Sequence, residues 1–223
     1  MADLAPGLQD ILRGTRAMQQ AIGTLQEKLD DSSRQAQQLK EEVARAREEA
    51  LLDGLTGLVN RKGFDHAITA CLLQEPTPFP GPCLMMIDVD RFKRINDTHG
   101  HLFGDRVLAR IGEILRANVK GKDTAARFGG EEFAVILPET PRGGALGLAE
   151  TLRALVAASR VTNGTRDELL IGNITVSIGV ADHVAGESAT ALVTRADRAL
   201  YAAKAQGRNR VALAPRPQTE AAK

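Results

Sequence analysis

The chain has 223 residues, of which 43% are apolar, so it can form one sizeable globular domain together with an additional segment. Its 29 basic and 28 acidic residues give a formal net charge of +1, which argues against broad electrostatic binding of nucleic acid or of anionic lipid. The two cysteines, Cys71 and Cys83, are too few for a disulfide framework and lack the spacing of a zinc site, so we interpret both as reduced thiols.

No stretch has the length and apolar character of a signal-peptide core, and none reaches the roughly 18 uninterrupted apolar residues that a membrane span requires. We therefore expect a cytoplasmic chain with no membrane span and no nucleic-acid partner. A piece cut from a longer receptor would lose the same signals.

The first 50 residues repeat an apolar side chain at alternating steps of three and four positions. Eleven of the thirteen positions in this series are apolar, and the series runs Leu8, Ile11, Thr15, Met18, Ile22, Leu25, Leu29, Ser32, Ala36, Leu39, Val43, Ala46 and Ala50. A repeat sustained over about six heptads is typical of a left-handed coiled coil, and a β-branched residue at a with leucine at d, as at Ile22 and Leu25, favours a parallel dimer. The alternative is one amphipathic helix lying on the domain, but such helices are usually shorter. We predict a dimerising helical stalk over residues 1–52, weakest over 32–36.

Residues 53–213 alternate between helical and extended patterns. The patterns predict helices over about 60–74, 103–119, 143–158 and 188–207, and strands over about 83–90, 123–128, 131–138, 173–182 and 210–214. Gly129 and Gly130 are the two-residue signal of a hairpin, and a second hairpin is expected to end in the strand at 173–182. Strands that alternate with covering helices indicate an α/β fold with a mixed or mostly antiparallel sheet. The last residues, 214–223, have the composition of a disordered tail.

Carboxylates gather in two places where folding alone gives no reason for them. Asp88 and Asp90 end an apolar strand and share one of its faces, while Glu131 and Glu132 follow the glycine pair and are expected to project to opposite faces. A carboxylate at such a strand end is costly to bury unless a cation meets it. If the hairpin lies beside that strand, at least one glutamate joins the aspartates in an oxygen site suited to Mg²⁺ and substrate phosphates. The alternative is a plain charged hairpin tip.

Basic residues near the same elements favour a phosphate ligand. Lys93 follows the acidic strand end, and Lys204 and Arg208 are four positions apart, so both are expected on one side of a helix end. The same two residues can also complement the dipole of a helix C-terminus that Gly207 caps. The two interpretations are compatible.

Five segments together resemble one known family, the GGDEF domain of diguanylate cyclases. The segments "DGLTGLVNRKGF", "IDVDRFKRINDTHGHLFGD", "RFGGEEF", "TVSIGVA" and "ADRALYAAKAQGRNRV" occur in the order and spacing of that family, over about residues 51–213. The resemblance implies a central five-stranded sheet wrapped by helices, similar to the palm of nucleotide polymerases and adenylyl cyclases. It also implies an enzyme that joins two GTP molecules into cyclic di-GMP and releases two pyrophosphates. Glu131 replaces the Asp of the family's name, which is a common active variant.

The resemblance further implies roles for individual residues. Two Mg²⁺ or Mn²⁺ ions per active site would be held by Asp88, Glu131 and the carbonyl of Val89. Glu132 would complete the second metal site or help to deprotonate the attacking 3′-hydroxyl, so the catalytic set is Asp88, Glu131 and Glu132. The guanine edge would be read by Asn96 and Asp105. The triphosphate would be held by Lys93, Lys204 and Arg208 and by the backbone amides of Arg91 and Phe92.

Each domain is expected to bind one GTP, so the second reactant would come from a second copy in a parallel homodimer joined by the stalk. A silent GTP or cyclic di-GMP sensor and a dimeric scaffold are the alternatives to an active enzyme. Many relatives carry an inhibitory product site, Arg-x-x-Asp, shortly before the glycine pair, whereas this chain has Lys120 and Asp123 at those positions. Lysine lacks the planar fork of arginine, so we expect weak product inhibition.

Overall fold

The computed structural model describes residues 13–15, 18, 23–26, 28–29, 31–40, 42, 50–73, 81–162, 170–171 and 174–216. The chain divides into two compact units, Met1–Ala50 and Leu51–Lys223. In the first unit, the described residues before Ala50 are helical, and four large apolar side chains of the repeat are exposed there: Met18, Leu25, Leu29 and Leu39. Five other positions of the repeat lie outside the described residues, namely Leu8, Ile11, Ile22, Val43 and Ala46. Coiled-coil pairing concerns a second chain and stays a prediction.

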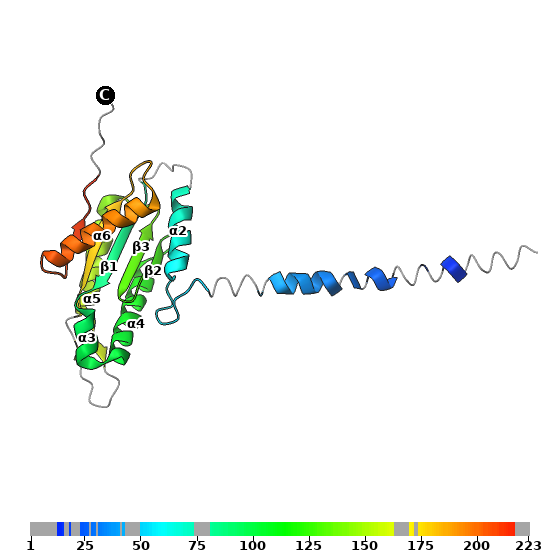
Figure 1. Cartoon of the computed structure of the whole chain (residues 1–223), viewed down its shortest axis with the longest axis horizontal. Helices are drawn as coiled ribbons and strands as arrows, with labels where there is room; N and C mark the ends of the chain where they lie inside the picture. Colours follow the sequence, from blue (N-terminus) through cyan, green and yellow to red (C-terminus); the bar gives the residue numbers. More distant parts are fainter. Residues whose placement is uncertain are drawn as a thin grey trace, which may run out of the picture. The chain divides into compact units, whose positions relative to one another are not determined.

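The second unit contains a sheet with helices on both faces (Figure 1). Its helices are α2 (Arg61–Leu73), α3 (Phe92–His99), α4 (His101–Asn118), α5 (Arg142–Ala158) and α6 (Ala189–Ala205). Its strands are β1 (Cys83–Val89), β2 (Thr124–Arg127), β3 (Glu132–Leu137), β4 (Val161–Thr162), β5 (Leu170–Ile171), β6 (Val176–Asp182) and β7 (Val211–Leu213).

The main sheet has five strands in the order β2-β3-β1-β6-β7. All neighbouring pairs are antiparallel except β6 and β7, which run parallel. The predicted five-stranded, mixed and mostly antiparallel sheet wrapped by helices is therefore confirmed.

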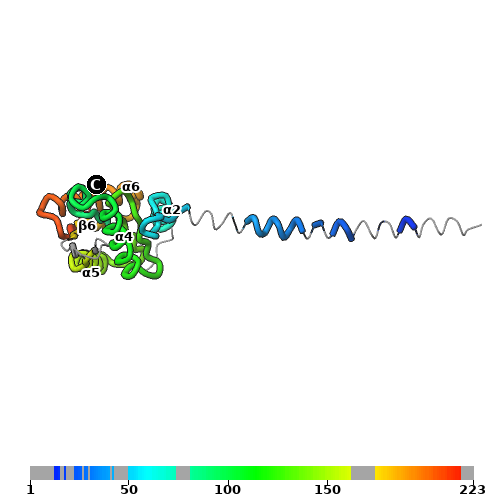
Figure 2. The backbone as a smooth tube through the Cα atoms, turned by 90° about the horizontal axis from the view of Figure 1, so that it is seen from below, coloured from blue at the N-terminus to red at the C-terminus, as the bar shows by residue number. Residues whose placement is uncertain are grey.

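The central strand β1 is buried along its whole length because helices cover both of its faces. Its odd-numbered residues, such as Met85 and Ile87, belong to a core with α4 and α5, whereas Leu84 and Met86 pack in a second core with α2 and α6. Figure 2 shows α5 and α6 on opposite sides of the unit. This burial explains why the strand is apolar without alternation from Cys83 to Ile87.

Helix α6 approaches β6 closely at Gly179. A Cβ atom at this position would overlap the backbone of α6 at Ala196 and Leu200. Only glycine leaves room for the helix here, so the Gly of the "TVSIGVA" segment has a packing reason.

Three expectations about the strands and helices need correction. The helix α3 was not predicted, although it follows β1 directly. The second hairpin is β4 with β5, which form a separate two-stranded sheet, whereas β6 pairs with β1 and β7. The glycine hairpin has a three-residue loop instead of two, because Phe128 and Glu132 are its closing pair.

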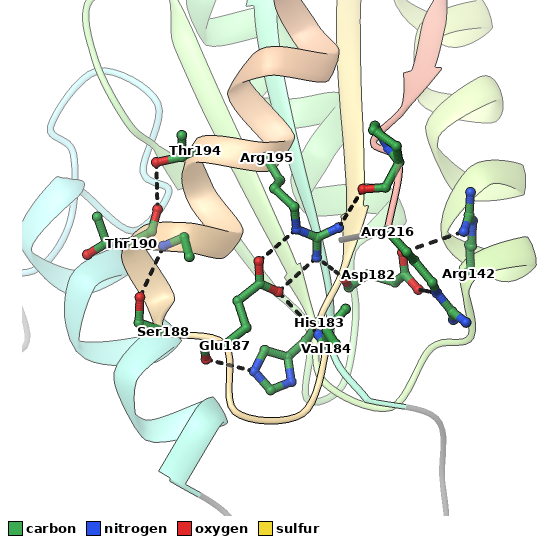
Figure 3. Close-up of polar contacts among 12 residues, drawn as sticks. Arg142, Asp182, His183, Val184, Glu187, Ser188, Thr190, Thr194, Arg195 and Arg216 are labelled. Atoms are coloured by element: carbon green, nitrogen blue, oxygen red, sulfur yellow. Dashed lines mark hydrogen bonds and ion pairs between the residues drawn. The ribbon is translucent and has the colours of Figure 1, made fainter. Parts of the chain in front are cut away.

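The predicted disordered tail begins at residue 214, but the first three residues of that segment contact the domain. The amide of Ala214 donates to the carbonyl of Val180, and the Nε of Arg216 lies 2.6 Å from Oδ2 of Asp182. Arg195 of α6 donates to the carbonyl of Pro215 at 3.2 Å (Figure 3). The prediction of disorder is wrong for these three residues, and 217–223 lie outside the described part.

A network of ion pairs holds this far end of the sheet together. The guanidinium of Arg195 binds Glu187 through two hydrogen bonds, at 2.7 and 2.8 Å, and also donates to the carbonyl of Asp182 (Figure 3). Burial opposes the ionisation of Glu187, but the hydrogen bonds from Arg195 and from the amide of Val184 outweigh it, so the pKa of Glu187 is lowered.

Among the described residues, no helix is both long and apolar enough to cross a bilayer.

Candidate active site

Asp88 lies at the end of β1, where the central strand meets the glycine hairpin. The residue is 5% exposed, and its Cα partner across the sheet is Glu132 of β3. Residues directly opposite each other in a sheet project from the same face. The amide of Val89 also donates to the carbonyl of Glu131 at 3.2 Å. The hairpin therefore lies beside the Asp88 strand, which is the condition under which a glutamate was expected to join Asp88.

A lysine from α6 meets the Asp88 carboxylate. Nζ of Lys204 is 2.8 Å from Oδ2 of Asp88. Burial and the negative charge of Asp90 raise the pKa of Asp88, and this effect exceeds the opposing effect of Lys204 and Arg208. The pKa of Glu131 is raised as well, by burial first and then by the charge of Asp88, against Lys204. The ionised forms of Asp88 and Glu131 are thus both disfavoured, and an additional cation nearby would stabilise them.

The hairpin loop consists of Gly129, Gly130 and Glu131. The amides of Phe128 and Gly129 both donate to the carbonyl of Glu132, at 2.8 and 3.2 Å. A Cβ at Gly129 would lie 2.6 Å from Oε2 of Glu132, so this glycine leaves space for the carboxylate. Glu131 belongs to the loop and not to the strand, so strand alternation, from which we expected opposite faces for the two glutamates, does not apply to it.

Arg127 braces this loop against the segment that precedes α2. Its Nη2 donates to the carbonyl of Gly130 at 2.8 Å, and its Nη1 lies 3.1 Å from Oδ2 of Asp53. Asp53 also accepts hydrogen bonds from the amide and hydroxyl of Thr56. Burial opposes ionisation of Asp53, but the hydrogen bonds from Thr56 and Arg127 outweigh it and lower its pKa. Neither Asp53 nor Arg127 was expected to have a role, although each is the first residue of a quoted motif segment.

Asp90 is a structural residue and not a free metal ligand. Its Oδ1 accepts from the hydroxyl of Ser177 at 2.6 Å. Its Oδ2 accepts from the hydroxyl of Thr175 at 2.7 Å and from the amide of Asn209 at 2.9 Å. These bonds join the end of β1 to the start of β6 and to the turn before β7. The expectation that both aspartates line a cation site is therefore wrong for Asp90 and stays a prediction for Asp88.

The residues expected to read guanine lie where α3 meets α4. Oδ1 of Asn96 is buried without a hydrogen-bond partner among the described residues. It packs so closely against Gly104 that a Cβ there would overlap it. Asp105 is the next residue of α4 and is exposed. An unpaired buried acceptor is costly, and a ligand that donates to it would remove that cost.

The residues expected to hold phosphate surround the start of α3 and the end of α6. Arg91 has a left-handed backbone (φ 57°) and begins the turn into α3, Phe92 is buried, and Lys93 is exposed. Arg208 does not extend the helix from Lys204, because α6 ends at Ala205 and Arg208 is also left-handed, with φ 60°. Its positive charge nevertheless opposes the raised pKa of Asp88.

Lys120 and Asp123 lie in the turn between α4 and β2, at the opposite end of the sheet from Asp88. Thr124, the next residue, pairs with Ile136, near the far end of β3. Burial and the charge of Glu139 raise the pKa of Asp123. The structure does not bring these two residues together with the carboxylates of Asp88 and Glu131.

The carboxylate site fits a divalent cation only in part. Within the part of the chain that the structure describes, no three His, Cys, Asp or Glu side chains form a ready-made metal site. Asp88, Glu131 and the backbone carbonyl of Val89 offer the hard oxygen ligands that Mg²⁺ prefers. Magnesium commonly completes its coordination with water and substrate phosphates, so the donor set fits an ion that arrives with a nucleotide.

Comparison with known proteins gives consistent matches over the second unit. A family model described as "Diguanylate cyclase, GGDEF domain" matches residues 50–210. Diguanylate cyclase VdcA of Vibrio cholerae is 34% identical over 204 residues, which are 92% of this chain and 59% of that protein. Diguanylate cyclase DgcM of Escherichia coli is 44% identical over 162 residues, which are 73% of this chain and 38% of that protein. The chain thus spans less than two thirds of the length of these relatives.

A solved structure resembles the chain as well. The coiled coil and GGDEF domain of DgcB from Caulobacter crescentus, in complex with c-di-GMP, has a TM-score of 0.78 and 36% sequence identity and covers 85% of this chain and 99% of that one. The family model covers well over half of the chain, and four of the five strands of the main sheet, the hairpin and the carboxylate pair lie within the matched residues, whereas β7 follows them. The chain belongs to the GGDEF-domain family of diguanylate cyclases.

Proposed function

We propose that this chain condenses two GTP molecules into cyclic di-GMP and two pyrophosphates, as a diguanylate cyclase. The observation that carries the proposal is the pairing of Asp88 with Glu132 across β1 and β3, with Glu131 in the adjoining loop and Lys204 on the Asp88 carboxylate. A scaffold would gain nothing from two carboxylates whose pKa values are raised side by side. Membership of the family supports the same reaction.

The carboxylates would serve as metal ligands. Diguanylate cyclases generally depend on divalent metal ions. Asp88, Glu131 and the Val89 carbonyl would hold two Mg²⁺ or Mn²⁺ ions, with Glu132 completing the second position. Bound ions would neutralise the charge that develops on the phosphate oxygens during displacement. Lys204, which contacts Asp88 in this structure, would also bind the triphosphate through its ammonium group.

The side chains would arrange an in-line displacement. The 3′-oxygen of one GTP attacks the α-phosphorus of the other, a new P–O bond forms, and the bond from the α-phosphorus to the bridging oxygen breaks, so pyrophosphate leaves. Glu132 would accept the proton of the 3′-hydroxyl and pass it to solvent. A second, identical displacement closes the ring and releases the second pyrophosphate.

Asn96 and Asp105 would select guanine. Guanine presents two adjacent donors, N1–H and the 2-amino group, and the unpaired Oδ1 of Asn96 and the carboxylate of Asp105 can accept from them. Adenine has an unprotonated N1 and no 2-amino group, so it would leave both acceptors unpaired and be rejected.

The stalk would bring the two reactants together. One domain binds one GTP, and the exposed apolar side chains of the first unit are available for pairing with a second copy. A parallel coiled coil over residues 1–52 would raise the effective concentration of two catalytic domains, each spanning 53–213. With Lys120 in place of arginine, inhibition by product at Lys120 and Asp123 would be weak.

Incubation with GTP and Mg²⁺, followed by mass spectrometry of the products, tests this function. The expected product is cyclic di-GMP with two equivalents of pyrophosphate, and Glu132→Gln is expected to lower its formation by about 100-fold or more. Glu113→Gln is a matched control, because Glu113 is an exposed residue of α4 that pairs with Arg110. GTP binding without product would instead indicate a sensor, and neither binding nor product would indicate a scaffold.

A further inference from the structure

A polar cavity of about 600 Å³ lies beside α3, on a face of this helix different from the one that carries Asn96. One wall is formed by α3, with Arg91, Arg94 and His99, and the other by the turn between α6 and β7, with Arg208 and Asn209. Asn96 and Phe92, by contrast, contact α4 at Gly104. The helix α3 therefore separates the expected guanine site from this cavity.

The charges that line the cavity are mainly positive. None of its arginines, Arg91, Arg94 and Arg208, forms a side-chain ion pair within the described residues. Its one carboxylate is Asp90, whose two oxygens are already occupied by three hydrogen bonds. Guanidinium groups without partners around a cavity are suited to an anion with several oxygens, such as a phosphate chain.

The backbone around the cavity is strained in a way found nowhere else in the described residues. Arg91, Arg208 and Asn209 have φ values of 57°, 60° and 45°, and they are the non-glycine residues with positive φ. All three line the cavity. Each such conformation is unfavourable for a residue with a side chain and persists only where the surrounding structure fixes it. Here the bond from the Asn209 amide to Asp90 contributes to that fixation.

The cavity adjoins the carboxylate site through one shared residue. Arg208 lines the cavity and its charge also acts on Asp88. A diphosphate that leaves a nucleotide held at Asp88 and Lys204 would meet Arg208 first and then Arg91 and Arg94. We infer that this cavity is a subsite for the pyrophosphate leaving group, an inference that rests on the proposed function. Arg91 and Arg94 bind the departing anion, so that it vacates the carboxylate site before it reaches solvent.

Calorimetric binding of inorganic pyrophosphate with Mg²⁺ to the full chain, without turnover, tests this subsite. Arg94→Gln removes one exposed guanidinium from the cavity and is expected to weaken pyrophosphate binding about tenfold, while Arg94→Lys restores part of it. Arg110→Gln is the matched control, because Arg110 is an exposed residue of α4 that does not line the cavity, and it should leave the affinity unchanged. Equal melting temperatures of the three variants would exclude misfolding as the cause.

The same variants are then measured with a GTP analogue that has a methylene group between the α- and β-phosphorus. The subsite predicts less than a twofold change in its affinity for Arg94→Gln, and a higher inhibition constant of pyrophosphate in the synthesis reaction. Unchanged pyrophosphate binding, or an equal loss of pyrophosphate and analogue binding, would overturn the inference. If pyrophosphate binding depends on Arg94 but wild type makes no cyclic di-GMP, the anion site stands and the proposed cyclase function fails.

Discussion

Asp88 combines a structural cost with an expected chemical role. Its buried carboxylate has a raised pKa even though Lys204 contacts it, so its ionisation opposes folding at neutral pH. A group whose folded pKa is raised stabilises the fold only while it is protonated, and this contribution is lost as the pH rises through the folded pKa. Asp90, two residues later, has a structural role, because its carboxylate accepts three hydrogen bonds that join β1 to β6 and to the turn before β7.

Replacing Asp88 by asparagine should therefore separate stability from activity. We expect Asp88→Asn to lose about 100-fold or more of the synthesis rate and yet to be at least as stable as wild type in urea at pH 7. Because protonation already neutralises Asp88 at low pH, any stability difference should shrink as the pH falls toward 4. A variant clearly less stable than wild type at pH 7 would show that the carboxylate has a structural role instead. Mg²⁺ should raise the melting temperature of wild type only.

The elements show which structural features the sequence predicts and which it does not. Strand β1 and helices α4, α5 and α6 were predicted within a few residues, because long apolar repeats with helix or strand period define them. Helix α3 was missed, since its eight residues, FKRINDTH, contain only two apolar side chains, too few to define a helical repeat. Its position depends on the burial of Phe92 against the core, which is a tertiary effect.

The sequence predicts parts of the geometry of the candidate site and misses others. From the residues alone, a glutamate was expected beside Asp88 only if the hairpin lay next to that strand, and the pairing of Asp88 with Glu132 meets this condition. The sequence placed Arg208 on the helix of Lys204, because spacing alone does not reveal the left-handed backbone after Gly207. The brace between Asp53 and Arg127 joins residues 74 positions apart, and no local pattern signals such a bond.

The contact between α6 and β6 makes Gly179 the most sensitive glycine of the sheet. Gly179→Ala would force a methyl group into the backbone of α6, so we expect a loss of about 2–3 kcal/mol in the free energy of unfolding, measured with urea. Gly147→Ala is the matched change on α5, where nothing lies within 4 Å of the added atom, and it should stabilise the helix by about 0.5–1 kcal/mol. Equal effects of both changes would contradict the close packing.

At the scale of the whole molecule, the two units are expected to divide the work between association and chemistry. The first unit exposes apolar side chains at positions of the repeat, and the second contains the carboxylates. If the reaction needs two facing domains, the phase of the stalk becomes a control of turnover, whereas GTP binding within one domain does not depend on it.

Insertions into the stalk test this division. Four extra residues after Ser32 break the seven-residue phase, and seven extra residues preserve it. We expect the first insertion to change turnover at least threefold and the second to leave it within twofold of wild type. The affinity of a GTP analogue should stay within twofold for both. Wild-type turnover in the four-residue variant would count against the stalk as a control element.

The direction of β7 also explains why cationic side chains are needed where the phosphates are expected to bind. Because β7 runs parallel to β6, the chain must cross back along the sheet between them. Helix α6 makes this crossover and ends near Asp88, at the end of the sheet where β1 finishes. A helix C-terminus carries negative partial charge, whereas the N-terminus of α3 at the same edge carries positive partial charge. A polyanion arriving there is attracted by one helix and repelled by the other. Lys204 and Arg208 reverse the repulsive end, so loss of either cation would leave a dipole that drives the nucleotide tail away.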